Sequence, residues 1–172
     1  MTDSSETPPP PRELARALAA NQRYAGQFDG STLLAPPARR LAVIACMDAR
    51  LTVEEMLGLR MGDAHIIRNA GGLATDDAIR SLVISQHLLG TDEVIVVEHT
   101  GCGMLTFDDE RVRLQIAAET GADVDLEFHA FHDLEANLRA QVARIRAHPW
   151  IKDIPVSGLI YEVESGRLRH VA

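Results

Sequence analysis

The chain lacks the features that mark secreted and membrane proteins. Its 172 residues include only two cysteines, Cys46 and Cys102, which is too few for a disulfide framework. No apolar run approaches the ~20 residues of a membrane-spanning helix, and the first residues, MTDSSETPPPP, lack the basic and apolar regions of a secretory signal. These absences predict a cytoplasmic protein whose two thiols are free to be metal ligands, nucleophiles or core residues.

Basic residues are also scarce. Lys152 is the single lysine, and the formal net charge is -8. Nucleic-acid-binding proteins usually present a basic face, so we expect no nucleic-acid partner. The length and the 46% content of hydrophobic residues are sufficient for one core but short for two. We therefore predict one domain over residues 12–172.

The N-terminal part of the chain differs from the rest. Residues 1–11 are polar and end in four prolines, which predicts a disordered or extended tail. Residues 11–25 carry apolar side chains at helical spacing and predict a helix. The following segment, DGSTLLAPPARR, is typical of a loop. Its length would let the helix pack away from the body or onto a partner.

Strand and helix patterns alternate through the remaining chain. The short helix after Leu51 has Thr52 and Glu55 at capping-box positions. The near-continuous apolar strands predict an α/β fold with a mostly parallel sheet covered on both faces. We expect strands at 40–46, 63–69 and 93–100, helices at 75–90, within 107–121 and within 133–149, and two final strands joined at Ser165 and Gly166.

Three metal-ligand side chains follow the ends of two predicted strands. Cys46 ends the first strand, whereas His99 and Cys102 lie at the end of the third, in HTGCGM. If the crossovers wind one way and then the other, these strands are neighbours, and their carboxyl ends form the usual ligand site of such sheets. Two thiolates and an imidazole favour zinc over calcium, magnesium or manganese. Three protein ligands leave a fourth position open, as in catalytic zinc sites.

Asp48 and Arg50 follow Cys46 at every second position. On an extended segment such residues point the same way, so Asp48 could either bind the metal as a fourth ligand or pair with Arg50. The first arrangement would close the site, and the second would admit a water molecule. We therefore interpret the pair as a gate for the fourth position.

These motifs carry a resemblance to a known family. CMDAR, RNAGG and HTGCGM resemble the motifs of the beta class of carbonic anhydrases, in particular its small actinobacterial-type members, and the similarity extends over roughly residues 12–171. The resemblance implies one zinc ion bound by Cys46, His99 and Cys102, with Asp48 and Arg50 as the dyad that opens the site. It also implies a Rossmann-like, mostly parallel sheet with an antiparallel C-terminal strand. The expected assembly is a homodimer, or a tetramer of such dimers, in which the N-terminal helix lies over the partner.

The resemblance further implies an activity. The expected reaction is the reversible hydration of carbon dioxide to bicarbonate and a proton, by attack of zinc-bound hydroxide, which makes the protein a lyase. Four histidines are nominal candidates for proton export: His65, His87, His129 and His132. One departure from the family pattern is Gly72, where an asparagine is frequent, and we expect this glycine to loosen the loop beside the metal.

Other functions remain open from the sequence. Carbon disulfide and carbonyl sulfide hydrolases resemble the same family closely, and the motifs around the zinc barely separate them. A zinc-bound bicarbonate sensor without catalysis is a second alternative. Thiol redox chemistry is a poorer one, because Cys46 and Cys102 do not form a Cys-x-x-Cys pair.

Overall fold

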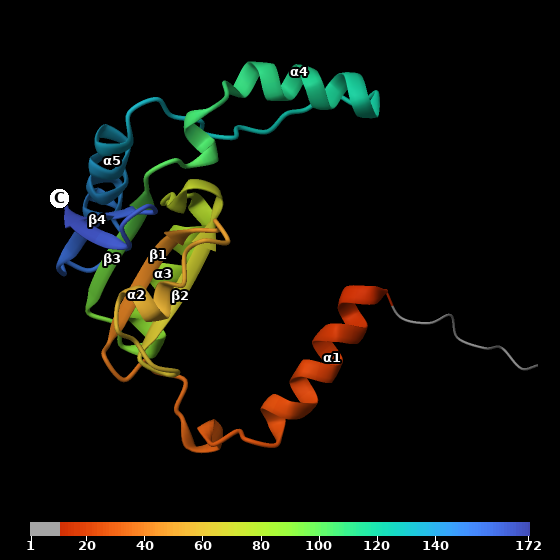
Figure 1. Ribbon diagram of the computed structural model, residues 1–172. Coiled ribbons are helices and arrows are strands. Elements are labelled where there is room, and N and C mark those ends of the chain that lie inside the picture. The colour runs from red at the N-terminus through yellow and green to blue at the C-terminus, as the bar shows by residue number, and fades with distance from the viewer. Residues whose placement is uncertain (1–10) are drawn as a thin grey trace, which may run out of the picture. The chain divides into compact units, whose positions relative to one another are not determined.

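The computed structural model describes residues 11–172 (Figure 1). The predicted tail at residues 1–11 therefore lies, except for Pro11, outside the described residues. The chain divides into one unit that ends at Leu33 and a second unit, Leu34–Ala172. The first contains the expected N-terminal helix, α1 (Arg12–Ala25), and a short 3₁₀ turn, η1 (Gly30–Thr32). None of the side chains of α1 is buried.

The second unit is built on a five-stranded sheet with the order β2-β1-β3-β4-β5. The first four strands in this order are parallel, and β5 pairs with β4 in the antiparallel sense. Both features confirm the predicted fold class. The strands are β1 (Leu41–Cys46), β2 (Ala64–Asn69), β3 (Glu93–His99), β4 (Val156–Glu162) and β5 (Arg167–His170).

The first strand occupies the centre of this arrangement. After β1 the chain crosses to β2 on one side, and after β2 it returns to form β3 on the other side. The strand order therefore reverses at β1, where a doubly wound sheet binds its ligands. All six residues of β1 are buried, which explains its continuous apolar sequence.

Apolar layers cover both faces of the sheet. Ala42 and Ile44 of β1 point to a cluster with side chains of α3 (Asp76–Leu89) and α5 (Leu134–Ala147). Leu41, Val43 and Ala45 point to the opposite face, where the short helix α2 (Val53–Met56) and its flanking residues pack. This alternation follows from the two-residue period of a strand. Within residues 11–172, no helix has both the length and the apolar character needed to span a membrane.

The helix ends are fixed by side-chain caps in two cases. At the start of α3 the hydroxyl of Thr75 accepts a hydrogen bond from the backbone N–H of Ala78, and α5 begins with an equivalent contact from Ala136 to Asp133. The capping box predicted at Thr52 and Glu55 is wrong, since Thr52 makes no side-chain cap bond. The helix α2 is only one turn long and is held instead by the complete burial of its first residue.

A 3₁₀ turn beside the end of β1 depends on a glycine. Gly72 closes the turn η2 (Ala70–Gly72) with φ of 71°. A Cβ atom at this position would lie 2.8 Å from the carbonyl oxygen of Val97 and 2.9 Å from the backbone nitrogen of Cys46. The expectation that Gly72 loosens this loop is therefore wrong. The glycine lets the turn pack tightly against the ends of β1 and β3.

We predict that Gly72→Ala destabilises the protein more than Gly90→Ala. Gly90 has a similar φ of 77° but open space around its Cα, so its substitution carries only the conformational cost of about 1–2 kcal/mol. Gly72→Ala adds a backbone clash and should cost about 1–3 kcal/mol more. Urea unfolding of both variants measures the difference. Equal losses would mean that the turn adapts to the methyl group.

Candidate metal centre

Two strand ends bring three candidate metal ligands together. Cys46 is the last residue of β1 and His99 the last of β3, and Cys102 follows on the turn after β3. The two sulfurs and an imidazole nitrogen lie within 4.8 Å of one another, and all three side chains are buried. The predicted grouping of these residues is thus present, and it forms a set that could hold a metal ion.

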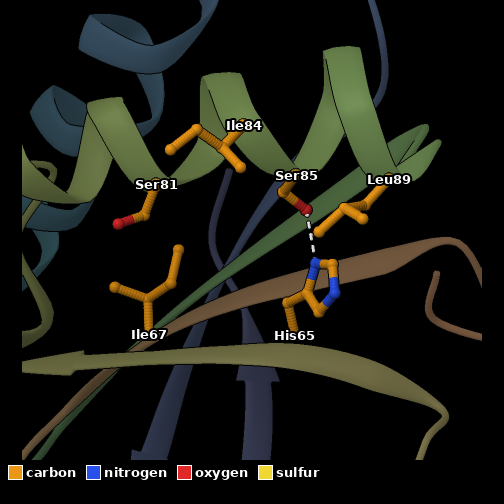
Figure 2. Close-up of a pocket in the computed structure, with 6 residues that line it drawn as sticks. All are labelled: His65, Ile67, Ser81, Ile84, Ser85 and Leu89. Carbon is orange, nitrogen blue, oxygen red and sulfur yellow. Dashed lines mark hydrogen bonds between the residues drawn. The ribbon is translucent and has the colours of Figure 1, made fainter. Parts of the chain in front are cut away.

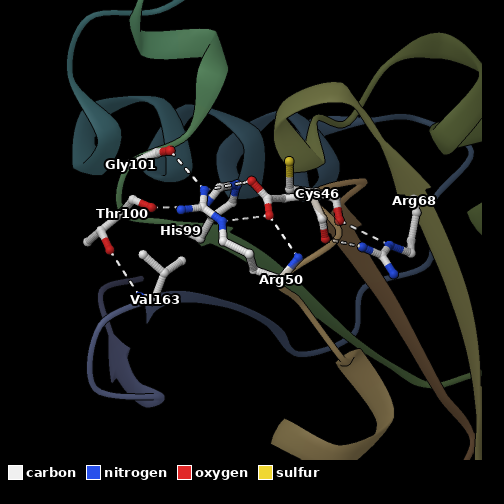
Figure 3. Close-up of polar contacts among 8 residues, drawn as sticks. Cys46, Arg50, Arg68, His99, Thr100, Gly101 and Val163 are labelled. Atoms are coloured by element: carbon white, nitrogen blue, oxygen red, sulfur yellow. Dashed lines mark hydrogen bonds and ion pairs between the residues drawn. The ribbon is translucent and has the colours of Figure 1, made fainter.

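The orientation of the histidine ring fits such an ion. His99 Nδ1 lies 2.9 Å from the carbonyl oxygen of Thr100, which can only accept, so Nδ1 carries the hydrogen. Thr100 is itself held by a hydrogen bond from the backbone N–H of Val163 to its hydroxyl (Figure 3). In the neutral ring Nε2 then has a free lone pair, and this fully buried atom has no hydrogen-bond partner within residues 11–172. A buried polar atom without a partner is costly, and a metal ion would satisfy it.

The two thiols differ in their pKa. A hydrogen bond with Cys102 lowers the pKa of Cys46, against the opposing effect of burial. The same hydrogen bond, together with burial, raises the pKa of Cys102. Without a cation the pair therefore favours one thiolate and one thiol. A divalent cation that prefers sulfur would remove the second proton and bind both thiolates.

The neighbouring glutamate adds little charge to this cluster. Glu98 precedes His99 on β3 and is almost completely buried. Burial raises the pKa of Glu98 to about 8, and its Oε1 accepts a hydrogen bond from the amide of Asn137. The carboxyl is therefore mostly neutral at pH 7. The thiols carry the main negative charge that a metal ion would meet.

Asp48 and Arg50 form a two-pronged ion pair at the edge of the cluster (Figure 3). Arg50 Nε donates to Asp48 Oδ1 over 2.9 Å, and Nη2 donates to Oδ2 over 2.7 Å. These hydrogen bonds hold the pKa of the Asp48 carboxyl well below its usual range. Arg50 Nη2 also donates to the carbonyl oxygen of Gly101, which links the pair to the loop that carries Cys102.

The pair is formed in a turn and not on an extended segment as expected. The backbone N–H of Leu51 donates to the carbonyl oxygen of Asp48 over 3.1 Å, and the backbone N–H of Arg50 donates to Asp48 Oδ1 over 2.9 Å. Asp48 Oδ2 lies 3.7 Å from His99 Nε2, close to the three ligand atoms but paired with Arg50. The role of Asp48 as a fourth ligand stays a prediction.

A cavity of about 380 Å³ opens onto the cluster. Cys46, Asp48 and Cys102 line it together with mainly apolar residues. The apolar residues include Met47, Ala70, Met104 and Phe107. This lining could not be predicted from the sequence, although Met104 belongs to the HTGCGM motif, because periodicity does not indicate which apolar residues face an opening.

The four candidate histidines lie elsewhere. His65 pairs with Ala42 in the sheet, four residues before Cys46, which places it roughly 13 Å along the strand. There it lines a separate cavity of about 210 Å³ between β2 and α3, and its Nδ1 lies 2.7 Å from the hydroxyl oxygen of Ser85 (Figure 2). His87, His129 and His132 do not line the cavity above the cluster either. The structure thus brings none of the four to the site.

Comparisons with known proteins agree with the fold. The family model described as carbonic anhydrase matches residues 41–168. Beta-carbonic anhydrase 1 of Mycobacterium tuberculosis is 45% identical over 155 residues, which cover 90% of this chain and 94% of that protein. A carbon disulfide hydrolase of Acidithiobacillus thiooxidans is 40% identical, over 88% of this chain and 90% of its own length. The crystal structure of a carbonic anhydrase from Streptococcus mutans matches with a TM-score of 0.90 and 42% identity, covering 95% of this chain and 100% of that one.

We predict that His99→Ala weakens metal binding by more than about 100-fold, because it removes one of three ligands. His132→Ala is the control, since His132 is exposed and its Nε2 lies 3.2 Å from Oδ1 of the exposed Asp108 at the surface. Competition with a chromophoric chelator measures both affinities. Unchanged affinity in His99→Ala would mean that the metal binds elsewhere.

Proposed function

The chain belongs to the beta class of the carbonic anhydrase family, and from this membership we propose that it catalyses the zinc-dependent, reversible hydration of carbon dioxide to bicarbonate and a proton. One observation carries the proposal. Cys46, His99 and Cys102 meet with an unpartnered imidazole nitrogen beside an aspartate–arginine pair, and the two cysteines and the aspartate line a mainly apolar cavity.

Zinc is the metal that this ligand set favours. Cys46, His99 and Cys102 would hold it, and two thiolates with one neutral imidazole form a soft, anionic set suited to zinc. When bound, zinc supplies the Lewis acidity that lowers the pKa of a water molecule and makes it a nucleophile near neutral pH. The hydrogen bond from His99 Nδ1 to Thr100 keeps Nε2 aimed at the two sulfurs.

Asp48 orients the nucleophile and controls access to it. Because Arg50 keeps its carboxylate ionised, Asp48 can accept a hydrogen bond from the attacking oxygen and fix the direction of its lone pair. While Asp48 is paired with Arg50, its carboxylate would leave the fourth position of a bound metal to solvent. A carboxylate that left Arg50 could take that position and close the site. Hydroxide would compete better with the carboxylate as the pH rises, so the Asp48–Arg50 pairing would be favoured at high pH.

The cavity walls receive the substrate. Carbon dioxide is small and apolar, and side chains such as Met47, Met104 and Phe107 offer an apolar surface beside Asp48 and the thiols. Such walls also exclude water from the reacting atoms. Bicarbonate is charged, so this apolar surface would bind it more weakly than carbon dioxide.

A carbon disulfide or carbonyl sulfide hydrolase is the second candidate. It is favoured by the carbon disulfide hydrolase relative, which is 40% identical over 88% of the chain. The same nucleophile attacks the carbon atom in each of these substrates, so the chemistry of the cluster does not separate them. Access through the apolar cavity would decide the preference.

We also propose that the protein is cytoplasmic, and that it forms a homodimer or a tetramer of such dimers. The support for the assembly is the exposed apolar surface at α1: Leu14, Leu18 and Tyr24 of the helix, and Phe28 after it, are each about half exposed. Such an amphipathic helix is typical of one that packs against another chain. Sedimentation equilibrium of the full chain would show a monomer if this is wrong.

Stopped-flow kinetics of the zinc-loaded protein test the function directly. We expect rapid hydration of carbon dioxide above about pH 8 and much slower hydration near pH 7. Release of sulfide from carbon disulfide or carbonyl sulfide, without hydration of carbon dioxide, would favour the second candidate. If neither reaction occurs across about pH 7–9, a non-catalytic bicarbonate sensor becomes the better interpretation.

We predict that Asp48→Asn lowers kcat about 10–100-fold and leaves the zinc content unchanged, because an amide neither pairs as well with Arg50 nor accepts as strongly. It should also flatten the pH dependence, since a neutral amide is a poor zinc ligand. Asp92→Asn removes the carboxylate of a surface ion pair with Arg40 and serves as the control. A fully active Asp48→Asn enzyme would rule out the assigned role.

A further inference from the structure

A second arginine, Arg68, contacts the main chain of the segment from Cys46 to Asp48. Arg68 is the fifth residue of β2 and lies opposite Ala45 in the parallel pairing with β1. Its Nε donates to the carbonyl oxygen of Cys46 over 3.0 Å, and its Nη2 donates to the carbonyl oxygen of Asp48 over 2.7 Å (Figure 3). One guanidinium therefore joins the main chain of a ligand to the main chain of the gate.

These contacts hold the segment where it leaves the sheet. The backbone N–H of Met47, between the two bonded carbonyls, donates to the carbonyl oxygen of Asn69 over 2.8 Å. Three successive residues are thus fixed to the end of β2. The backbone N–H of Leu51 also donates to the carbonyl oxygen of Asp48, which closes the turn that follows.

Two arginines act on the same aspartate in different ways. Arg50 binds the carboxylate of Asp48, whereas Arg68 binds its carbonyl oxygen. The carboxylate of Asp48 can form both hydrogen bonds with Arg50 only while the main chain of Asp48 keeps its present orientation. The bidentate fork of Arg68 suits this task, because a lysine ammonium cannot span two carbonyls with the same rigid geometry.

The partners of Arg68 support a role toward this segment. Within residues 11–172, no carboxylate forms an ion pair with Arg68, although many other arginines of the chain have such partners. Its charge is directed to the two carbonyl oxygens instead. Hydrogen bonds from a charged donor are about twice as strong as neutral ones, so the two hydrogen bonds of Arg68 should hold this segment strongly.

We infer that Arg68 is a positioning residue: it fixes the main chain of Cys46 and Asp48, so that the carboxylate stays with Arg50 and the thiol faces His99. This inference rests on the proposed function for its catalytic meaning, but its geometric part concerns only the metal cluster. Without Arg68 the segment would rotate more freely. Asp48 would then leave Arg50 more often and approach the cluster.

The test compares Arg68→Gln and Arg68→Lys in protein whose zinc has been replaced by cobalt(II). The visible absorption of cobalt reports the number and kind of its ligands, including thiolate charge transfer. We expect Arg68→Gln to change this spectrum and to lower kcat about 10–100-fold with little change in KM. Arg68→Lys should give an intermediate result, because it keeps the charge and can bind one carbonyl.

The matched control is Arg39→Gln. Arg39 Nη2 donates to the carbonyl oxygen of Gly58 over 2.9 Å, so this variant also removes a contact between a guanidinium and a main-chain carbonyl. It lies before β1, at the opposite end of the strand from the cluster. We expect its cobalt spectrum and kcat to match those of the wild type. Thermal unfolding of each variant confirms that the compared samples are folded.

A double-variant cycle shows whether Arg68 acts through Asp48. In the Asp48→Asn background, Arg68→Gln should lower kcat by much less than it does alone. Full additivity, or a wild-type cobalt spectrum in both Arg68 variants, would overturn the inference. If the wild type binds cobalt through thiolates but does not hydrate carbon dioxide, the proposed function fails. A spectral change in Arg68→Gln would still support the positioning role in that case.

Discussion

The parallel pairing of β1 with β3 is the constraint on which the rest of the site depends. Ala45 lies opposite Val97, so the two strands end within a few residues of each other at one edge of the sheet. Cys46 and His99 come from these ends, and the turn after β3 brings Cys102 back to them. The side chains of β1 are buried on both faces, so the strand end that carries Cys46 is held within the core. The precision of the cluster is therefore a property of the core.

Close packing at the end of β1 positions the backbone around the cluster. The turn at Gly72 lies against the backbone of Cys46 and Val97, and no other residue type would fit that approach. Arg68 then fixes the segment after Cys46 through main-chain carbonyls. Neither Gly72 nor Arg68 lines the cavity. They determine where Asp48, which does face the cavity, can point.

The cluster and its neighbours carry few unbalanced negative charges. The two thiols favour one negative charge between them, and Glu98 stays mostly neutral because it is buried. Asp48 is fully ionised, but its charge is balanced by Arg50. A divalent cation would thus enter a site that is negative enough to attract it. The balance also avoids several unpaired charges in the interior, which would be costly.

Several parts of this arrangement could be predicted from the sequence. The apolar runs indicated the strands, and the order of strand and helix patterns indicated a parallel sheet with its site at the strand ends. The residue types of Cys46, His99 and Cys102 indicated a metal cluster there. Local patterns were less informative where packing competes with them. The capping box at Thr52 is not formed, because burial of Val53 holds that turn.

The sequence by itself determined which side chains carry the chemistry, because residue type sets what a thiol, an imidazole or a carboxylate can bind. Only the tertiary structure decided how they are held. The contacts of Arg68 with Cys46 and Asp48 join residues about twenty positions apart, and such contacts leave no periodic signal in a single chain. The same is true of the close approach at Gly72 and of the free nitrogen of His99, since both depend on atoms brought together by the sheet.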